Sequence, residues 1–575
     1  MKKANFTMQN FRDQLASYEA MPQLVLLGLL CGISCGLLIA AFRFAIDLPL
    51  TLLLSEHVEN FESLSPLQRF CFPAAGGLTL ALLYQYWSLI KNKVGLVHLL
   101  ERLAYHQGHI PFKNLLAQFI SAVVALVSGQ SVGREGPAIY MGASLSSLIG
   151  QWLHIPHNSQ RILVACGSAA AISAAFNTPL AGVIFAMEVI LLDYTIAGFT
   201  PIIVAAVSSS IITRIIFSAQ PVFDVPAFDI LSHSEIPWIM VLGIVTGSLA
   251  ALFIKLMIET KTRITLSLPY KLTLAGLLTG LVAIFYPQVM GTGYDTMSAV
   301  FAGNVATHLL LGILIAKVLL TPIILGLGIP AGMIGPALFI GSLAGALLGH
   351  AGGFLVETDV SHIGLYAMLG MGAMMAAILN APLAALIALL ELTYNPNIIL
   401  PAMVAIIVAN LTTRNMFNMP SSLLAMLHAQ GLDYRLEPLA QVLSRASVAK
   451  AMQRDFLSCE TLVSQEQAKQ LLSQNKMWLV VTNQLLPTNV LPMMNIKSFL
   501  ERDILCANEA VNLERIPAQR FEVVKVNLRS TLNDALQKMN NKDTDLLCVY
   551  DHSNELIGIL TRSHIENYYN NKQYL

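Results

Sequence analysis

The chain has 575 residues, of which 55% are hydrophobic and 12% charged, and its mean hydropathy is +0.63. This composition is too apolar for an ordinary soluble domain and predicts a polytopic membrane protein. The 34 acidic and 34 basic residues balance, so net charge favours neither a nucleic-acid partner nor an acidic substrate. Seven scattered cysteines and thirteen histidines show no ligand or disulfide spacing, so we expect no metal site.

The first residues, 1–22, are polar and precede a long apolar run without a small-residue cleavage site. We therefore expect a retained cytoplasmic lead-in and no removed signal peptide. The positive-inside rule places two basic loops on the cytoplasmic side, and their basic residues are Lys91, Lys93, Arg102 and Lys113 in one and Lys255, Lys261, Arg263 and Lys271 in the other. A polar tail follows Arg414, so both termini are expected in the cytoplasm.

Apolar segments long enough to cross or enter a bilayer fill most of the chain up to residue 413. Several fall short of the roughly 20 residues that a full span needs and are interrupted by Gly and Pro, which predicts helices that end inside the protein. The segments cover residues 24–45, 70–90, 115–130, 136–152, 161–176, 179–192, 199–217, 237–257, 272–287, 307–328, 336–350, 363–377, 381–393 and 399–413.

A polar pentad, Gly133-Arg134-Glu135-Gly136-Pro137, interrupts the apolar chain and opens a helix. A helix start has unpaired N–H groups and the positive end of the helix dipole, so it can bind an anion. Glu135 is then a tethered competitor for that anion. The alternative is a first-turn acid that favours its own helix or pairs with Arg134. Because charge inside a membrane is expensive and tends to be functional, we favour the first interpretation.

The two halves of the apolar region, at about 23–220 and 235–425, repeat one another. The pentad recurs 199 residues later as Gly332-Met333-Ile334-Gly335-Pro336, and Asn-x-Pro-Leu-Ala followed by a glutamate recurs at an offset of 203. Duplicated halves with broken helices, often inverted, predict a site at their interface. Ile334 occupies the position that corresponds to Glu135 in the second copy. The two helix starts are therefore expected to form one anion-binding site with a single acidic side chain that can block it.

Other charges in the apolar region have structural interpretations. Glu188 and Glu391 are equivalent in the repeat, which indicates a scaffold role such as capping buried N–H groups. For Lys317 we favour snorkelling or pairing within the helix bundle over attraction of anions.

These motifs resemble the CLC family of chloride channels and chloride/proton exchangers, with GREGP at 133–137, GMIGP at 332–336 and FNTPLAGVIFAMEV at 176–189. The GTGY at 291–294 is most similar to the bacterial ClcB-like branch. The resemblance implies an all-α CLC transmembrane domain over 23–430, with inverted repeats and broken helices. It also implies a homodimer with one pore per subunit in a bacterial inner membrane, with Glu135 as the gating glutamate.

This chain departs from the family pattern at three positions, two at the anion site and one at the proton relay. The resemblance assigns the anion to Gly133, Arg134, Glu135, Gly136, Met333, Ile334, Val94 and Ser422. Val94 replaces the usual coordinating serine, and Ser422 is a weak substitute for the usual tyrosine. We therefore expect backbone N–H groups to hold the anion. Val189 stands where exchangers often have an inner proton-relaying glutamate, which leaves Glu135 as the proton-carrying side chain.

The resulting expectation is chloride transport gated by protonation of Glu135, passive and channel-like, with chloride/proton antiport as the alternative. Fluoride or nitrate transport is less favoured. A divalent cation transporter would need clustered carboxylates along the path. An enzyme would need a nucleophile and base, or metal ligands, and no such arrangement is found.

A polar tail with alternating helix and strand patterns follows a linker at 431–446. Within 447–575 a repeat at an offset of 67 and the run Leu556 to Ser563 resemble a pair of CBS motifs, the first degenerate, in a small α/β cytoplasmic domain. Such pairs often bind adenine nucleotides through a Thr or Ser and an Asp three residues later. Thr561 is present but His564 replaces the Asp, so a structural or dimerising tail is an equal alternative.

Overall fold

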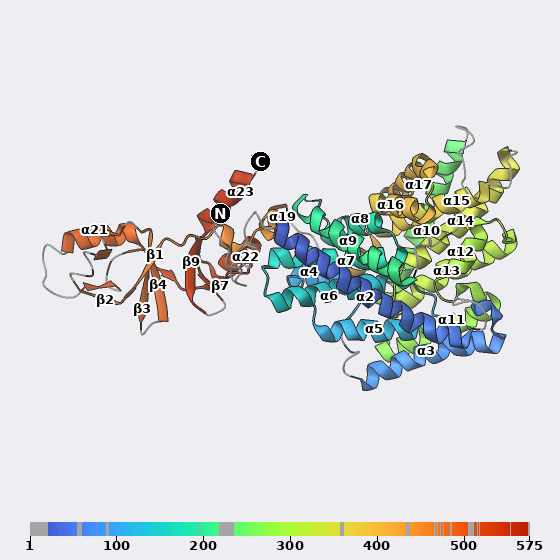
Figure 1. The fold of residues 1–575 in the computed structure, drawn as a ribbon, viewed down its shortest axis with the longest axis horizontal. Coiled ribbons are helices and arrows are strands. Elements are labelled where there is room, and N and C mark those ends of the chain that lie inside the picture. Colours follow the sequence, from blue (N-terminus) through green and yellow to red (C-terminus); the bar gives the residue numbers. More distant parts are fainter. Residues whose placement is uncertain are drawn as a thin grey trace. The chain divides into compact units, whose positions relative to one another are not determined.

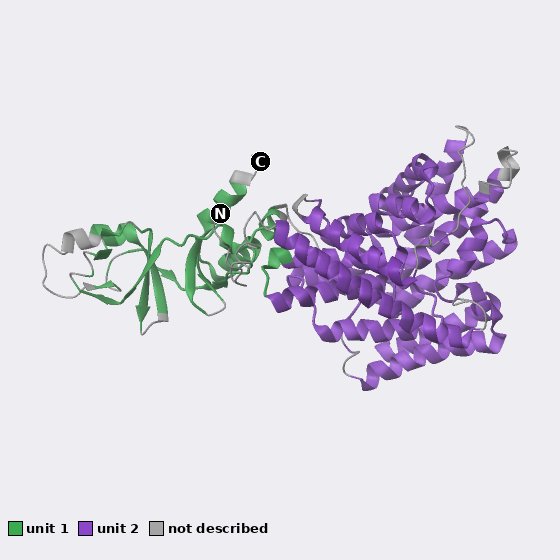
Figure 2. Ribbon diagram, in the orientation of Figure 1, with its two compact units in different colours: residues 1–20, 154–159, 435–575 green, residues 21–153, 160–434 purple. Residues whose placement is uncertain are grey.

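The computed structural model describes residues 21–572 with internal gaps, and most of the lead-in at 1–22 lies outside the described residues. The gaps are 55–59, 88–90, 92, 195, 218–222, 224–234, 357–361, 433–437, 465–466, 468–469, 472, 475, 484–485, 504–510, 514–515, 517 and 552–553. Contacts divide the chain into two units (Figure 2). One is helical and comprises 21–153 and 160–434, and the other contains 435–575 with the short segment 154–159 and residues 1–20.

Every apolar segment expected from the sequence forms a helix (Figure 1). Eight helices among the described residues are long and apolar enough to span a membrane, and others are shorter, as expected for helices that end inside the protein. The helical unit contains α2 (Met21–Leu53), α3 (Pro66–Tyr86), α4 (Leu96–Tyr105), α5 (Phe112–Val127), α6 (Glu135–Leu153), α7 (His157–Phe176), α8 (Pro179–Phe185), α9 (Ile196–Phe217), α10 (Ile236–Arg263), α11 (Leu268–Phe285), α12 (Tyr294–Phe301), α13 (Thr307–Leu327), α14 (Ile334–Val356), α15 (His362–Leu379), α16 (Pro382–Thr393), α17 (Ile399–Leu411) and α18 (Ser422–His428).

Equivalent residues of the two halves adopt the same conformation where helices break. Asn177, between α7 and α8, and Asn380, between α15 and α16, have φ values of 58° and 55°. Asparagine tolerates this left-handed conformation better than most residues, so it can end one helix and let the next begin in a new direction. The repeat read from the sequence is therefore also a repeat of backbone geometry.

The two halves cap each other's helices. The carboxylate of Glu188 accepts a hydrogen bond at 2.7 Å from the backbone N–H of Ala384 in the first turn of α16, and its other oxygen accepts one at 3.3 Å from the preceding N–H. Glu391 does the same for α8, with the N–H of Ala181 at 2.8 Å and the preceding one at 3.0 Å. Charged acceptors at helix starts satisfy N–H groups that have no partner within the helix. The scaffold role expected for both glutamates is confirmed.

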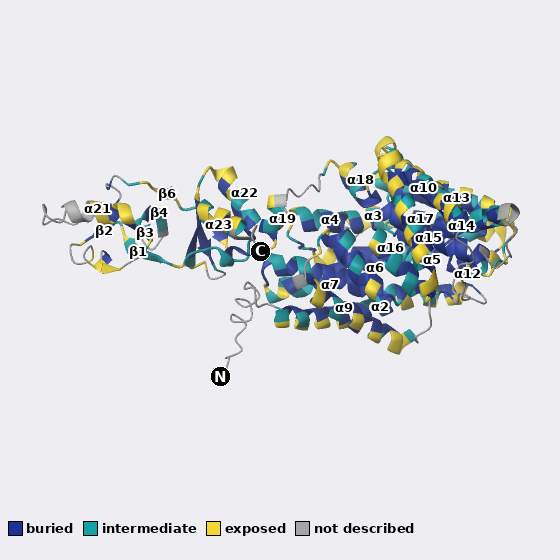
Figure 3. Ribbon diagram, turned by 90° about the horizontal axis from the view of Figure 1, so that it is seen from above, coloured by how far each residue is buried: buried dark blue, intermediate teal, exposed yellow. Residues whose placement is uncertain are grey.

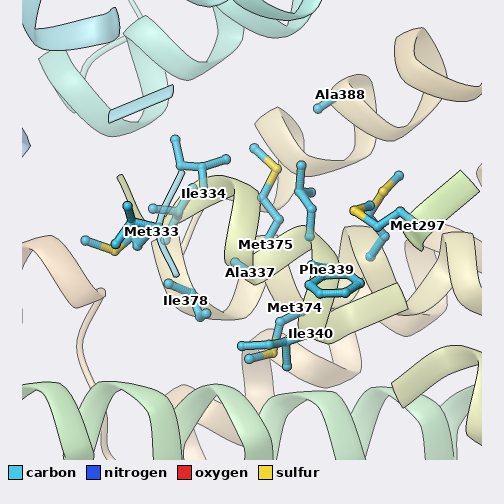
Figure 4. Packing of buried hydrophobic residues seen from close by; sticks show 14 of the residues in the cluster. Met297, Met333, Ile334, Ala337, Phe339, Ile340, Met374, Met375, Ile378 and Ala388 are labelled. Carbon is cyan, nitrogen blue, oxygen red and sulfur yellow. The ribbon is translucent and has the colours of Figure 1, made fainter. Parts of the chain in front are cut away.

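Buried residues concentrate in α6, α7, α14 and α15, while α2 and α3 carry many exposed apolar side chains (Figure 3). Glycines allow the central helices to approach closely. A Cβ atom on Gly142 would lie 2.4 Å from the carbonyl oxygen of Gly167, and one on the equivalent Gly341 would lie 2.3 Å from that of Gly370. Labelled apolar residues of α14 and α15 pack together in this core (Figure 4).

The second unit consists of two halves with the same strand order. In the first half β1 (Phe456–Glu460) pairs parallel with β3 (Trp478–Asn483), which pairs antiparallel with β4 (Leu486–Pro492). In the second half β7 (Lys525–Asn527), β8 (Leu546–Tyr550) and β9 (Leu556–Thr561) repeat this pattern. The remaining elements are β2 (Leu462–Val463), β5 (Val511–Asn512), β6 (Phe521–Glu522), α19 (Pro438–Ser444), α21 (Met493–Asp503), α22 (Leu532–Lys542) and α23 (Arg562–Lys572).

The two halves of this unit share a hydrophobic core. Val480 and Val490 of the first half pack in one cluster with Leu546 and Ile559 of the second. A separate core under α22 includes Leu443 of α19. Packed structure therefore begins before residue 447, within the stretch that the sequence indicated as a linker.

Candidate functional site

Two helix starts, one from each repeat, meet through their backbones. The N–H of Gly133 donates to the carbonyl oxygen of Gly332 at 2.8 Å, and the N–H of Gly332 donates to that of Gly133 at 2.8 Å. A Cβ atom on Gly332 would lie 2.6 Å from the backbone nitrogen of Gly136, so only glycine fits. The equivalent motifs, 199 residues apart, are thus joined as an antiparallel pair directly before α6 and α14.

The side chain of Glu135 lies at the start of the opposite helix. It is 1% exposed, and its Oε2 accepts a hydrogen bond from the backbone N–H of Gly335 at 3.1 Å. Its Oε1 accepts a hydrogen bond from the hydroxyl of Tyr294. The carboxylate therefore lies at the positive end of α14, among donors that would otherwise face an anion.

Tyr294 was not singled out by the sequence analysis. It is the first residue of α12, follows Gly293 with its φ of 81°, and is 8% exposed. Its ring packs edge-on against Phe223, with 5.6 Å between centroids, and the guanidinium of Arg134 lies 5.1 Å from its centroid. One sequence signal could have found it. Gly95 begins α4 as Gly293 begins α12, so the GTGY loop is the repeat counterpart of the loop that carries Val94.

Lys317 supports the loop before Tyr294. The side chain is fully buried, and its Nζ donates hydrogen bonds to the carbonyl oxygens of Val289 at 2.8 Å and Gly291 at 3.2 Å. It also lies 4.9 Å from the ring centroid of Phe339. Of the two structural roles expected for Lys317, pairing within the bundle is confirmed and snorkelling is not, because carbonyl groups inside the bundle solvate the ammonium group.

A cavity of about 550 Å³, called here the inner cavity, is lined by Gly332 and Met333 of the second helix start. Lys93 and Lys261 also line it; they come from the two basic stretches that the sequence predicts to be cytoplasmic, and Lys261 lies in the last turn of α10. Val94 and Met333 also line this cavity, so the structure brings together two of the residues expected to bind the anion.

The remaining expected positions are placed as follows. Ser422 is fully buried, and its hydroxyl donates to the sulfur of Met333 at 3.0 Å, so the hydroxyl is already engaged. Gly136 and Ile334 are buried at the helix starts. Val189 is 5% exposed in a π-helical turn after α8 and brings no titratable group.

Thr561 ends β9, where α23 begins. Its hydroxyl bonds that of Ser563 at 2.9 Å and accepts from the N–H of His564 at 3.4 Å. The Nδ1 of His564 accepts from the N–H of Thr561 at 3.2 Å. Thr561, the candidate nucleotide-binding residue, and His564, which replaces the usual Asp, are thus hydrogen-bonded to each other at the start of α23. Within the described residues, no group of three or more His, Cys, Asp or Glu side chains could hold a metal ion.

Eight candidate membrane spans among the described residues, two related halves and one carboxylate between two joined helix starts define an anion-conducting membrane protein. The sequence profile of the voltage gated chloride channel family matches residues 76–414, and that of the CBS domain matches 516–571. The chain belongs to this chloride channel family, the CLC family.

Similar proteins include a ClcB-like protein of Ralstonia nicotianae, 32% identical over 351 residues, which are 60% of this chain and 82% of the relative. The voltage-gated ClC-type chloride channel ClcB of Salmonella typhimurium is 28% identical over 402 residues, which are 68% of this chain and 96% of the relative. A slow cyanobacterial Cl⁻/H⁺ antiporter of known structure has the same fold, with a TM-score of 0.62 at 23% identity, over 71% of this chain and 98% of that one.

Proposed function

We propose that this membrane protein carries chloride, and other small monovalent anions, along a path through the paired starts of α6 and α14, with Glu135 as its gate. The observation that carries the proposal is the position of the Glu135 carboxylate, which accepts the backbone N–H of Gly335 at the start of the opposite helix. A carboxylate and a halide compete there for the same donors. An arriving anion therefore displaces the side chain.

Protonation provides a second way to move the gate. A neutral carboxyl group is attracted less strongly by the helix dipole and by the donors that hold the carboxylate, because charge-assisted hydrogen bonds are roughly twice as strong as neutral ones. Low pH should therefore release Glu135 and open the path. Glu135 is the proton-carrying side chain in this scheme.

Passive, channel-like movement is favoured over tight exchange because the inner position next to Glu188 is the buried, apolar Val189. A protein without a titratable group at that position lacks the proton relay that an inner glutamate provides in exchangers. Chloride/proton antiport is the second candidate, and a pH gradient that drives chloride uphill at fixed stoichiometry would establish it. A reversal-potential measurement under combined chloride and pH gradients distinguishes the two.

Anion selectivity should depend mainly on backbone groups. Val94 supplies no hydroxyl, and the Ser422 hydroxyl donates to Met333. The N–H groups of the helix starts and the nearby charge of Arg134 remain as the anion's partners. Comparing fluxes of chloride, fluoride, nitrate and magnesium in proteoliposomes separates these anions from one another and from the cation-transport alternative.

The gate assignment is tested with Glu135→Gln, which keeps the shape of the side chain and removes its charge. We expect chloride efflux from proteoliposomes at neutral pH to reach the level that the unmodified protein shows only at acid pH. Glu391→Gln, which removes a carboxylate charge from a helix cap outside the path, is the control. If chloride efflux through the Glu135→Gln protein kept the pH dependence of the unmodified protein, Glu135 would not be the gate.

The same proposal includes a homodimer with one path per subunit, located in a bacterial inner membrane with both termini in the cytoplasm. An adenine nucleotide is a candidate ligand of the C-terminal unit through Thr561. The mass of the detergent-solubilised complex tests the first part, and calorimetric titration with ATP tests the second.

A further inference from the structure

Among the described residues, the inner cavity is lined by one histidine, the type of side chain that gains a charge most readily as the pH falls. Among the described residues that line it, the titratable ones are Lys93, Lys261, Tyr84 and His98. Of these residue types, histidine has the ordinary pKa closest to neutrality. His98 is 7% exposed and lies on α4, two residues after its first.

The surroundings of His98 accept both protonation states of the ring. Its Nδ1 lies 2.8 Å from the hydroxyl of Tyr140, which can donate to a neutral ring or accept from a protonated one. Asn114 donates to the carbonyl oxygen of Lys93 at 2.8 Å, which holds the loop beside α4. The ring is thus held in place against the loop that carries Val94, on the wall of the cavity.

The charges around His98 keep the ring neutral until an anion approaches. The pKa of His98 is lowered to about 4, mainly by burial; Glu101 raises it, and Arg102, Lys93 and His106 lower it by smaller amounts. Glu101 is itself paired with Lys93 at 3.3 Å.

The helices that pack against α4 bring few further charges to the ring. Tyr140 is the partner from α6, whose other titratable residue is Glu135, and α18 lines the cavity with the apolar Leu423 and Met426. The titratable residue of α18 is His428, the last residue of that helix. A bound anion next to the ring would therefore be the main new charge and would favour protonation.

We propose that His98 is a proton-dependent anion-binding position in the inner cavity, where a monovalent anion and a proton bind together. This position is additional to the gate at Glu135, although it rests on the proposed passage of anions through the same cavity. Because linkage is reciprocal, a proton on His98 raises anion affinity by the factor by which the anion raises proton affinity. Acidification of the cytoplasmic side then loads the path with anions.

The test measures chloride binding by calorimetry in the full-length Glu135→Gln protein, in which the gate no longer titrates. For a unit charge several ångströms from the anion, we expect chloride affinity about three- to tenfold higher at about pH 4.5 than at about pH 7.5. Each bound chloride should also take up protons, seen as a dependence of the binding heat on the ionisation heat of the buffer. Adding His98→Gln should abolish both effects.

The matched control is His106→Gln, because His106 is an exposed histidine at the end of the same helix. Adding it should leave both effects in place. If His98→Gln does not fold, Tyr140→Phe tests the same pair by removing the hydroxyl from Nδ1, and it should change the pH at which affinity rises.

Three results would overturn the inference. The first is proton uptake on chloride binding that persists after His98→Gln, and the second is a loss of both effects with His106→Gln as large as the loss with His98→Gln. The third is chloride binding that does not depend on pH in the Glu135→Gln protein. The last result would leave the gate assignment intact. That assignment fails separately, through unchanged pH dependence of flux in Glu135→Gln.

Discussion

Tyr294→Phe should loosen the gate without changing its charge. The substitution removes the hydroxyl that donates to Oε1 of Glu135 and leaves the ring, its contact with Phe223 and the N–H of Gly335 in place. A hydrogen bond to a charged group contributes about 1.5–3 kcal/mol. At about 1.4 kcal/mol per tenfold, the displaced position of the gate should become roughly ten- to a hundredfold more populated relative to the held one.

The assay is chloride efflux from proteoliposomes at neutral pH, with Glu135→Gln as the reference for a gate without charge. Efflux through Tyr294→Phe should lie between that of the unmodified protein and that of the reference, and acidification should add less than it adds to the unmodified protein. Tyr366→Phe is a matched control, because the Tyr366 hydroxyl donates to another buried carboxylate, Glu235, at 3.3 Å.

The reasoning is refuted if Tyr294→Phe conducts like the unmodified protein at neutral pH while Glu135→Gln conducts strongly. It is also refuted if Tyr366→Phe gives the same increase, because the effect would then follow from general loosening of the fold.

Two further predictions follow from the groups around the gate. Lys317→Met leaves the carbonyls of Val289 and Gly291 without this donor, at a cost of about 1–3 kcal/mol of folding free energy. The melting temperature should therefore fall, and chloride efflux at neutral pH should rise as in Tyr294→Phe. Normal stability with unchanged efflux would contradict this prediction. Gly332→Ala places a methyl group 2.6 Å from the backbone nitrogen of Gly136, so we expect the amount of folded protein or the transport rate to fall by more than about tenfold. Gly372→Ala is the control and should fold and transport, because the nearest atom, at 3.1 Å, is the end of a flexible side chain. A fully active Gly332→Ala protein would show that the helix starts are not joined.

The helices and the main contact of the candidate site can be predicted because each has a local signature. Apolar runs of bilayer length mark the helices, and the repeated glycine-proline motifs are enough to pair the starts of α6 and α14. The placement of Glu135 near the second start follows from that pairing. These inferences need only spacing along the chain.

The spacing of the glycine-proline motifs does not identify the second partner of Glu135, the hydroxyl of Tyr294. Tyr294 is 159 residues from Glu135, in a short helix that is not an apolar segment, and its loop aligns with the first half only after a shift in the offset. The hydrogen bonds of Lys317 and the contact between His98 and Tyr140 likewise connect segments that share no motif. Such contacts depend on how helices pack, which hydrophobic spacing does not determine.

The exchange of caps between Glu188 and Glu391 has a consequence for the origin of this architecture. Each glutamate completes a helix in the other half, so neither half alone satisfies the starts of both α8 and α16. A single ancestral half could make the same bonds as a pair of identical chains inserted in opposite directions, each lending its carboxylate to its neighbour. Fusion of such a pair frees the two copies to diverge, and the isoleucine at 334 opposite Glu135 is the kind of asymmetry that only a fused chain can hold.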